Sequence, residues 1–184
     1  MTRTATVFDV SIAAFKTANA ISRQNTPGAA EAEVASLRHR LLQFHEFPAS
    51  AADAGFADAD PVFVVGLPRS GKTTIESMLT GSDPFSGVGE QRIMPRLVAT
   101  ALAQNGDDVS GWPAAAWTAL GEAYASEVAA LMPPGRRPVD TLPPNFALVG
   151  FIHAALPRAT IIHTKRDRPE HLVALFEKYL TGGG

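Results

Sequence analysis

The sequence predicts an α/β fold in which helices flank a parallel sheet. Residues 61–66 and 159–163 are short, continuous apolar runs rich in β-branched residues, which is typical of strands buried on both faces. Helical periodicities alternate with these runs, as expected for parallel strands joined by crossover helices. Residues 138–140 suggest a third, very short strand. Because most sheets contain more strands than this, we expect the sheet to be incomplete at its C-terminus.

Size and composition limit the classes of function. The chain has 184 residues, 46% of them hydrophobic and 18% charged, which is a globular composition. A net charge of −2 argues against broad affinity for nucleic acid or anionic membranes. The absence of cysteine excludes disulfides, thiolate catalysis and cysteine-ligated zinc. Since there is neither a signal-like apolar region nor an apolar run long enough to span a membrane, we expect a cytoplasmic protein.

The region before the first strand predicts a short helical segment followed by a linker. Apolar residues recur at helical spacing in residues 8–23 and again in residues 29–46. The second helix has an apolar stripe of Val34, Leu37, Leu41 and Phe44. We therefore divide the chain into an N-terminal helical segment, a linker and an α/β domain, at residues 1–47, 48–60 and 61–184.

Within the α/β domain, the remaining periodicities predict a series of helices. They are expected at residues 71–80, 90–105, 117–131, 145–156 and 169–180. The stretch 81–87 is rich in glycine and serine and predicts a loop. Trp112 and Trp117 are expected to be packing residues.

The turn after the first strand carries the most specific motif. Residues 66–73 fit the pattern G-x-x-x-x-G-K-T, with a buried strand before it and a helix after it. Glycines let the backbone wrap an anion, and the helix adds unpaired N–H groups and the positive end of its dipole. Arg69 and Lys72 supply full charges, and Thr73 and Thr74 supply hydroxyl donors. The turn therefore predicts a site for a phosphorylated nucleotide.

One alternative is a kinase or NTPase that binds ATP with magnesium. Such an enzyme needs an acidic magnesium ligand at the end of a second strand. Asp140 follows a poor strand, whereas Asp167 follows a good one but lies among Lys165, Arg166 and Arg168. A basic surrounding suits an anion better than a metal, so the alternative is weakened but stays open.

Four segments, in order along almost the whole chain, resemble one known family. Residues 68–74 resemble the 5′-phosphosulfate loop of bacterial sulfotransferases, many of which carry N-terminal tetratricopeptide repeats. Residues 87–90 continue this resemblance, and residues 91–96 are similar to the related tyrosylprotein sulfotransferases. Residues 140–146 resemble a family segment that usually reads Asp-Lys-Met-Pro-x-Asn-Phe, and residues 159–167 resemble the strand that leads to the 3′-phosphate site.

This resemblance implies a transfer of sulfuryl from 3′-phosphoadenosine-5′-phosphosulfate to a hydroxyl of a small molecule or a peptide tyrosine, without a metal. The residues implied at the 5′-phosphosulfate are Arg69, Ser70, Gly71, Lys72, Thr73 and Thr74. Arg166 would bind the 3′-phosphate. Glu90 would be the general base, and Arg69 and Lys72 would add charge at the transferring group. The N-terminal helices would be the remnant of a repeat array that docks on the domain or on a protein partner.

Three departures from the family pattern bear on activity. Lys72 stands where the family usually has threonine, Thr141 replaces a lysine that would contact the transferring group, and Ala174 replaces a serine near the 3′-phosphate. We expect Lys72 to stand in for the lysine missing at position 141. The chain also ends earlier than the family pattern, which suggests a C-terminal truncation. A non-catalytic nucleotide-binding remnant is therefore a further alternative.

Overall fold

The computed structural model describes residues 29–44, 47–167 and 170. The chain divides into two compact units: residues 37–165 form one, and residues 1–36 with 166–184 form the other. The helices expected at residues 8–23 and 169–180 lie outside the described residues, apart from position 170. The unit of residues 37–165 contains the sheet.

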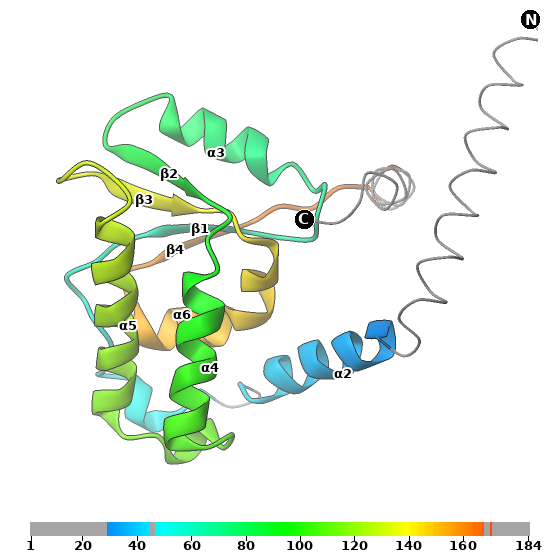
Figure 1. Ribbon diagram of the computed structural model, residues 1–184, viewed down its shortest axis with the longest axis vertical. Coiled ribbons are helices and arrows are strands. Elements are labelled where there is room, and N and C mark those ends of the chain that lie inside the picture. The colour runs from blue at the N-terminus through cyan, green and yellow to red at the C-terminus, as the bar shows by residue number, and fades with distance from the viewer. Residues whose placement is uncertain (1–28, 45–46, 168–169, 171–184) are drawn as a thin grey trace, which may run out of the picture. The chain divides into compact units, whose positions relative to one another are not determined.

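A four-stranded parallel sheet forms the centre of this unit, which confirms the α/β fold (Figure 1). The strands follow the order β2-β3-β1-β4, and each neighbouring pair is parallel. Their bounds are β1 Val62–Val65, β2 Phe85–Gly89, β3 Arg137–Asp140 and β4 Thr160–His163. Because all four strands run the same way, the segments that follow them meet at one edge of the sheet.

Helices cover both faces of the sheet because side chains alternate along β1. Val62 and Val64 pack with residues of α3, whereas Phe63 and Val65 belong to the larger core on the opposite face. The covering helices are α3 Lys72–Thr80 on the first face and α4 Ile93–Asn105, α5 Ala114–Ala129 and α6 Val149–Ala155 on the second. Three short 3₁₀ helices complete the unit: η1 Ala49–Ala51, η2 Val109–Gly111 and η3 Pro143–Leu148.

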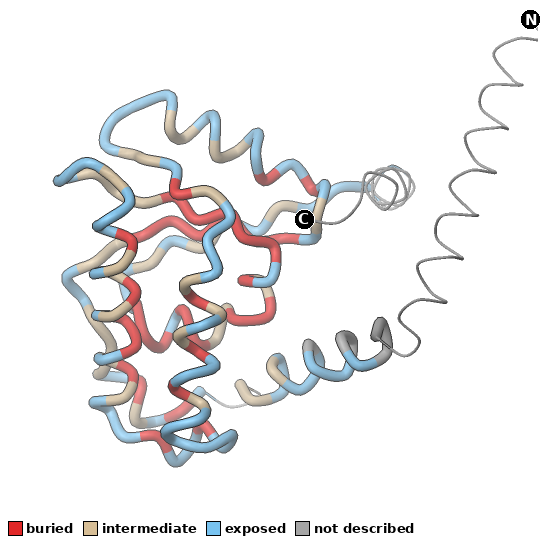
Figure 2. Tube along the Cα trace, in the orientation of Figure 1, coloured by how far each residue is buried: buried red, intermediate tan, exposed pale blue. Residues whose placement is uncertain are grey.

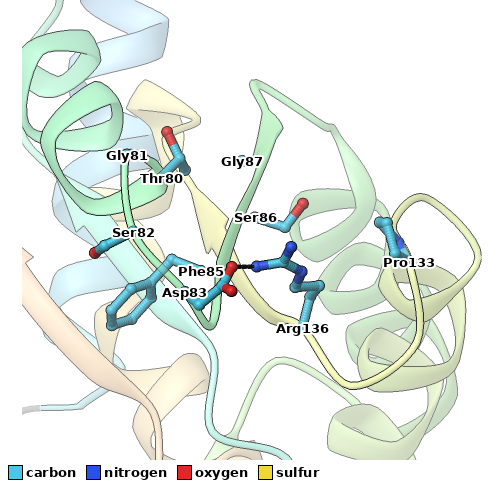
Figure 3. Close-up of a pocket in the computed structure, with 9 residues that line it drawn as sticks. All are labelled: Thr80, Gly81, Ser82, Asp83, Phe85, Ser86, Gly87, Pro133 and Arg136. Atoms are coloured by element: carbon cyan, nitrogen blue, oxygen red, sulfur yellow. Dashed lines mark hydrogen bonds and ion pairs between the residues drawn. The ribbon is translucent and has the colours of Figure 1, made fainter.

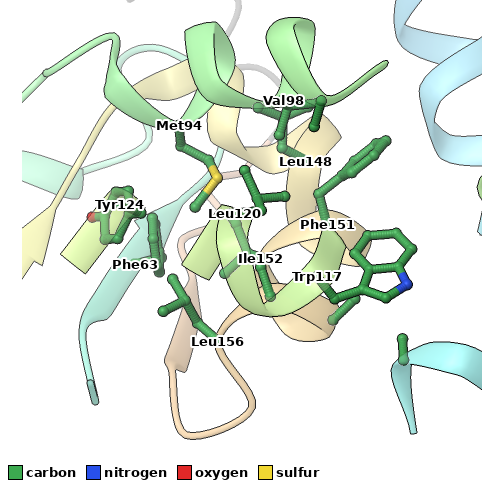
Figure 4. Packing of buried hydrophobic residues seen from close by; sticks show 14 of the residues in the cluster. Phe63, Met94, Val98, Trp117, Leu120, Tyr124, Leu148, Phe151, Ile152 and Leu156 are labelled. Atoms are coloured by element: carbon green, nitrogen blue, oxygen red, sulfur yellow. The ribbon is translucent and has the colours of Figure 1, made fainter. Parts of the chain in front are cut away.

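The core is concentrated under α4, α5 and α6 and is rich in aromatic rings (Figures 2 and 4). Trp112 and Trp117 are both fully buried, with ring centroids 4.6 Å apart, which confirms that they are packing residues. Phe151 of α6 contacts both tryptophans. Phe44 lies edge-on to Phe151, with centroids 4.7 Å apart, and so joins the segment after α2 to the core.

The region before β1 differs in part from expectation. Helix α2 covers Ala29–Leu42, so it ends before Phe44, and Leu41 is 53% exposed rather than part of a buried stripe. The side chains of Val34 and Leu37 lie outside the described set. The segment 48–60 contains η1, whose Ala51 is buried. The Phe56 N–H also donates to the Ala155 carbonyl of α6. This segment is thus packed against the core along part of its length.

Three elements of the sheet and its helices correct the sequence-based expectations. A strand, β2, begins inside the stretch that was expected to be a loop and runs to Gly89, because its Phe85–Gly89 backbone pairs with β3 despite its glycines. Strand β4 is half-exposed rather than buried, since among the described residues it pairs with β1 alone. The expected helix at residues 145–156 is split into η3 and α6.

Candidate functional site

The loop from Gly66 to Gly71 joins β1 to α3 and lies at the carboxyl-terminal edge of the sheet (Figure 1). Gly66 and Gly71 have φ angles of 149° and 98°, a region that favours glycine. A Cβ on Gly66 would lie 2.5 Å from Thr164 Oγ1, so only glycine fits against the end of β4. A Cβ on Gly71 would meet no heavy atom within 4 Å. The loop is therefore closely packed at Gly66 and open at Gly71.

The loop is open at Gly71, where α3 begins. Gly71 caps the helix without any side-chain hydrogen bond, so no side chain of the cap occupies the first-turn N–H groups. Such N–H groups have no partner within the helix, and the helix dipole adds positive potential there. Arg69, Thr73 and Thr74 are all at least partly exposed at this point. The arrangement can accept an anion with several oxygen acceptors.

Lys72 lies inside the loop instead of projecting from it. Its side chain is only 5% exposed, and its Nζ donates to the Leu67 carbonyl at 3.2 Å. The ammonium thus reaches back to the start of the loop and places a full positive charge there. This position fits a cation that stabilises a bound anion.

Ser70 is also buried in the loop, and its partner was not expected from the sequence. Ser70 Oγ lies 2.6 Å from Thr164 Oγ1, and Thr164 directly follows β4. The signal that could have found Thr164 is its position at the end of a strand parallel to β1. In an open α/β sheet, ligands bind at that edge.

Glu90 follows the last residue of β2, at the same edge of the sheet. The strand pairing skips Val88, so a bulge lies immediately before Glu90. Bulges commonly re-aim the side chains that follow them. Glu90 is exposed, and no described residue forms a hydrogen bond or ion pair with its carboxylate. The carboxylate is thus available to an incoming ligand.

Arg166 belongs to the unit of residues 1–36 with 166–184, whereas the loop belongs to the other unit. Within its own unit, Arg166 Nε lies 3.2 Å from Glu170 Oε2, and the guanidinium is about half exposed. The role of Arg166 at a 3′-phosphate stays a prediction.

Asp140, the considered magnesium ligand at the end of β3, is fully occupied by protein donors. Its Oδ1 accepts from the Leu142 N–H and from Asn145 Nδ2, and its Oδ2 accepts from the Tyr124 hydroxyl, all at 3.0 Å. Asp140 is 1% exposed, and burial raises its pKa from 3.8 to about 6. Burial and the nearby Asp140 charge also raise the pKa of Tyr124 well above its ordinary value. Asp140 thus acts as a structural group that fixes the turn after β3.

This raised pKa predicts that Asp140 makes stability depend on pH. Between its unfolded value of 3.8 and its folded value of about 6, the folded protein holds a proton that the unfolded chain has released. The stabilisation is therefore complete below the unfolded pKa and is lost as pH rises through the folded pKa. We expect the free energy of unfolding to fall by roughly 2 kcal/mol from about pH 4 to about pH 7. This fall is the change in the free energy of unfolding of the wild-type protein after the change measured for Asp140→Asn over the same pH range has been subtracted.

Urea unfolding of both proteins at the two pH values measures this difference. The amide introduced by Asp140→Asn keeps the shape of the side chain and cannot titrate, so every other ionisable group contributes equally to both proteins. An identical pH dependence in wild type and variant would show that Asp140 titrates normally.

Glu76 of α3 is a further carboxylate, for which the sequence predicts no role. Its Oε2 accepts from the Thr141 hydroxyl at 3.3 Å, and a Cβ on Gly87 would lie 2.7 Å from its Oε1. Glu76 thus links α3 to the residue that follows β3, and its carboxylate packs against Gly87 of β2. Thr141 is 3% exposed and donates its hydroxyl proton to Glu76, so it offers a ligand neither a charge nor a donor.

A separate polar pocket of about 430 Å³ lies at the opposite end of β2 and β3 (Figure 3). Thr80 ends α3, Phe85 begins β2 and Arg136 precedes β3, and all three line this pocket. Arg136 forms an ion pair with Asp83 there. The pocket is therefore distinct from the loop at the carboxyl-terminal edge.

The described part of the chain contains no group of three or more His, Asp or Glu residues arranged to hold a metal ion. None of the helices in that part is both long enough and apolar enough to cross a membrane.

Comparisons with known proteins agree with the resemblance in the sequence. The model of the sulfotransferase family matches residues 61–182. An uncharacterised protein of Aquifex aeolicus (strain VF5) is 32% identical over 134 residues, an alignment that covers 67% of this chain and 18% of that protein. This chain thus spans less than a fifth of the length of that relative. No solved structure matches the chain. Because the family match extends over more than half of the residues and includes the loop, α3 and all four strands, the chain belongs to the sulfotransferase family.

Proposed function

We propose that the chain binds 3′-phosphoadenosine-5′-phosphosulfate and transfers its sulfuryl group to an acceptor hydroxyl. The observation that carries this proposal is the loop of residues 66–71, which combines an uncapped helix N-terminus with a buried Lys72 in a member of the sulfotransferase family. The acceptor would be a small molecule or a peptide tyrosine. The N-terminal helices are candidates for contact with a protein partner.

The 5′-phosphosulfate would be held at the start of α3. The residues that would hold it are Arg69, Ser70, Gly71, Lys72, Thr73 and Thr74. The loop fits such a group because no cap side chain bonds to the first-turn N–H groups and no heavy atom lies within 4 Å of where a Cβ on Gly71 would be. Arg166 would bind the 3′-phosphate.

In the transfer, the bond from sulfur to the phosphate oxygen breaks as a bond from sulfur to the acceptor oxygen forms. The acceptor proton moves to Glu90, which would act as general base. Negative charge grows on the bridging oxygen and on the departing nucleotide. Arg69 and Lys72 would stabilise this charge together with the loop amides.

The replacement of lysine by Thr141 removes one cation from this set, since Thr141 is buried and bonded to Glu76. Lys72 would supply the missing charge from within the loop. Ala174 lies outside the described residues. If Lys72 does not compensate, the chain would bind the donor without transferring sulfuryl, which is the second candidate function.

A magnesium-dependent kinase or NTPase is less well supported. Its metal ligand would be expected at the end of a strand beside β1, which is where Asp140 lies. Both oxygens of that carboxylate already accept hydrogen bonds from buried protein donors. A magnesium ion would have to displace those donors.

Calorimetry with three nucleotides tests the proposed donor. We expect 3′-phosphoadenosine-5′-phosphate to bind at least about tenfold more tightly than AMP, because a charge-assisted contact to the 3′-phosphate contributes about 1.5–3 kcal/mol. Magnesium should not change this affinity. Arg166→Ala should remove the discrimination, whereas Arg158→Ala, a change at an exposed arginine elsewhere, should not. Tighter binding of ATP that requires magnesium would overturn the assignment.

A further inference from the structure

Three oxygen atoms, from Val65, Ser70 and Thr164, form a short hydrogen-bonded chain beside the loop of residues 66–71. Thr164 Oγ1 lies 3.2 Å from the Val65 carbonyl oxygen and 2.6 Å from Ser70 Oγ. Ser70 is 8% exposed and Thr164 is half-buried, so protein surrounds much of the chain. All three residues belong to the unit of residues 37–165.

The number of protons in this chain limits what Ser70 can offer to a ligand. Each hydroxyl carries one proton. If Thr164 donates to the Val65 carbonyl, Ser70 must donate to Thr164, and it then has no proton left for a bound anion. If Thr164 donates to Ser70 instead, the Ser70 proton can point outward to the anion.

The second arrangement costs little because the Val65 carbonyl has another donor. The backbone N–H of Thr164 donates to the same oxygen at 2.8 Å, a shorter contact than that of the hydroxyl. The carbonyl therefore stays satisfied when the Thr164 hydroxyl rotates away. An unsatisfied buried acceptor would otherwise oppose the change.

Gly66 lies directly against the hydroxyl groups of Ser70 and Thr164. A Cβ there would lie 2.5 Å from Thr164 Oγ1 and 2.9 Å from Ser70 Oγ. The two hydroxyls thus pack directly against the loop backbone, and their separation is set by the strand end and the loop together. Thr164 therefore fixes the position of the Ser70 hydroxyl.

We propose that Thr164 is a positioning residue for the donor site, and that anion binding reverses the direction of this hydroxyl chain. In the bound form, Thr164 donates to Ser70, and Ser70 donates to an oxygen of the 5′-phosphate. Each hydrogen bond in such a chain polarises the next, so Ser70 becomes a stronger donor than an isolated serine. This inference rests on the proposed function, because it requires the loop to bind the 5′ end of the nucleotide.

A double-mutant cycle on the binding of 3′-phosphoadenosine-5′-phosphate, measured by calorimetry, tests the inference. Ser70→Ala should weaken binding about tenfold or more, as expected for loss of a donor to a charged group. Thr164→Val keeps the shape but removes the hydroxyl, and it should weaken binding by roughly 3- to 10-fold. Because Thr164 acts through Ser70, the double variant should bind no worse than Ser70→Ala alone. Thr164→Ser should restore most of the affinity.

Urea unfolding without nucleotide shows whether each variant is folded under the binding conditions. Wild-type affinity in Thr164→Val, or fully additive losses in the double variant, would overturn the role of Thr164 while leaving the donor assignment intact. Absence of binding by the wild-type protein would instead reject the proposed function.

Discussion

Glu90→Gln should lower the rate of sulfuryl transfer by about 10²- to 10⁴-fold, the usual contribution of a general base. The amide cannot take the acceptor proton, but it keeps the size of the side chain. Glu90 is exposed after the β2 bulge, and no described residue bonds to its carboxylate, so the change removes no structural contact there. Donor affinity should stay within about twofold. Transfer to a panel of phenolic and aliphatic hydroxyls, with labelled donor, measures the rate.

Glu122→Gln provides the control, because Glu122 is an exposed glutamate on α5 and does not belong to the segment that follows β2. It should transfer sulfuryl at the wild-type rate. Retained activity in Glu90→Gln would remove Glu90 from the reaction. A loss of donor affinity as large as the loss of rate would make it a binding residue instead.

Gly66→Ala should abolish donor binding and lower the free energy of unfolding by roughly 2–4 kcal/mol. Two costs add here: a φ of 149° that other residues rarely adopt, and a Cβ that would overlap Thr164 and Ser70. The loop would have to move away from the end of β4, and the N–H groups of α3 would lose their orientation. Urea unfolding and calorimetry with 3′-phosphoadenosine-5′-phosphate measure the two effects.

Gly135→Ala is a control that has the cost of a positive φ without the cost of a steric overlap. Gly135 has a φ of 75°, but a Cβ there would meet nothing within 4 Å, and the residue precedes β3, far along the chain from the loop. It should cost only about 1–2 kcal/mol and leave donor binding unchanged. Equal losses of stability in both variants would show that the contact between Gly66 and Thr164 is unimportant.

The sequence predicts those elements whose local residue pattern matches the surroundings that the folded protein gives them. Strand β1 and the turn after it are such elements. The apolar run of β1 is buried on both faces, and the glycines of the following turn adopt the φ values that the motif requires. Strand β2 could not be found in this way, because Gly87 and Gly89 are typical of a loop. It is a strand because β3 pairs with its backbone and because Gly87 leaves room for Glu76.

The sequence predicts which residues form the candidate site, but it does not predict the contacts that these residues make. The motif identifies Ser70 and Lys72, yet not that Lys72 turns inward to the Leu67 carbonyl or that Ser70 bonds to Thr164. These contacts join positions up to 94 residues apart, and no local pattern records them. Asp140 shows the same limit, because its role depends on Tyr124 and Asn145, which lie on separate elements.

The claim that the loop of residues 66–71 grips the 5′ end of an adenosine donor is tested most directly by nuclear magnetic resonance. In a titration with 3′-phosphoadenosine-5′-phosphate, the backbone N–H signals of Gly71, Lys72 and Thr73 should show the largest shifts, because these groups face the anion. Largest shifts instead at Ser82, Ser86 and Arg136, around the polar pocket at the far end of β2, would contradict the claim.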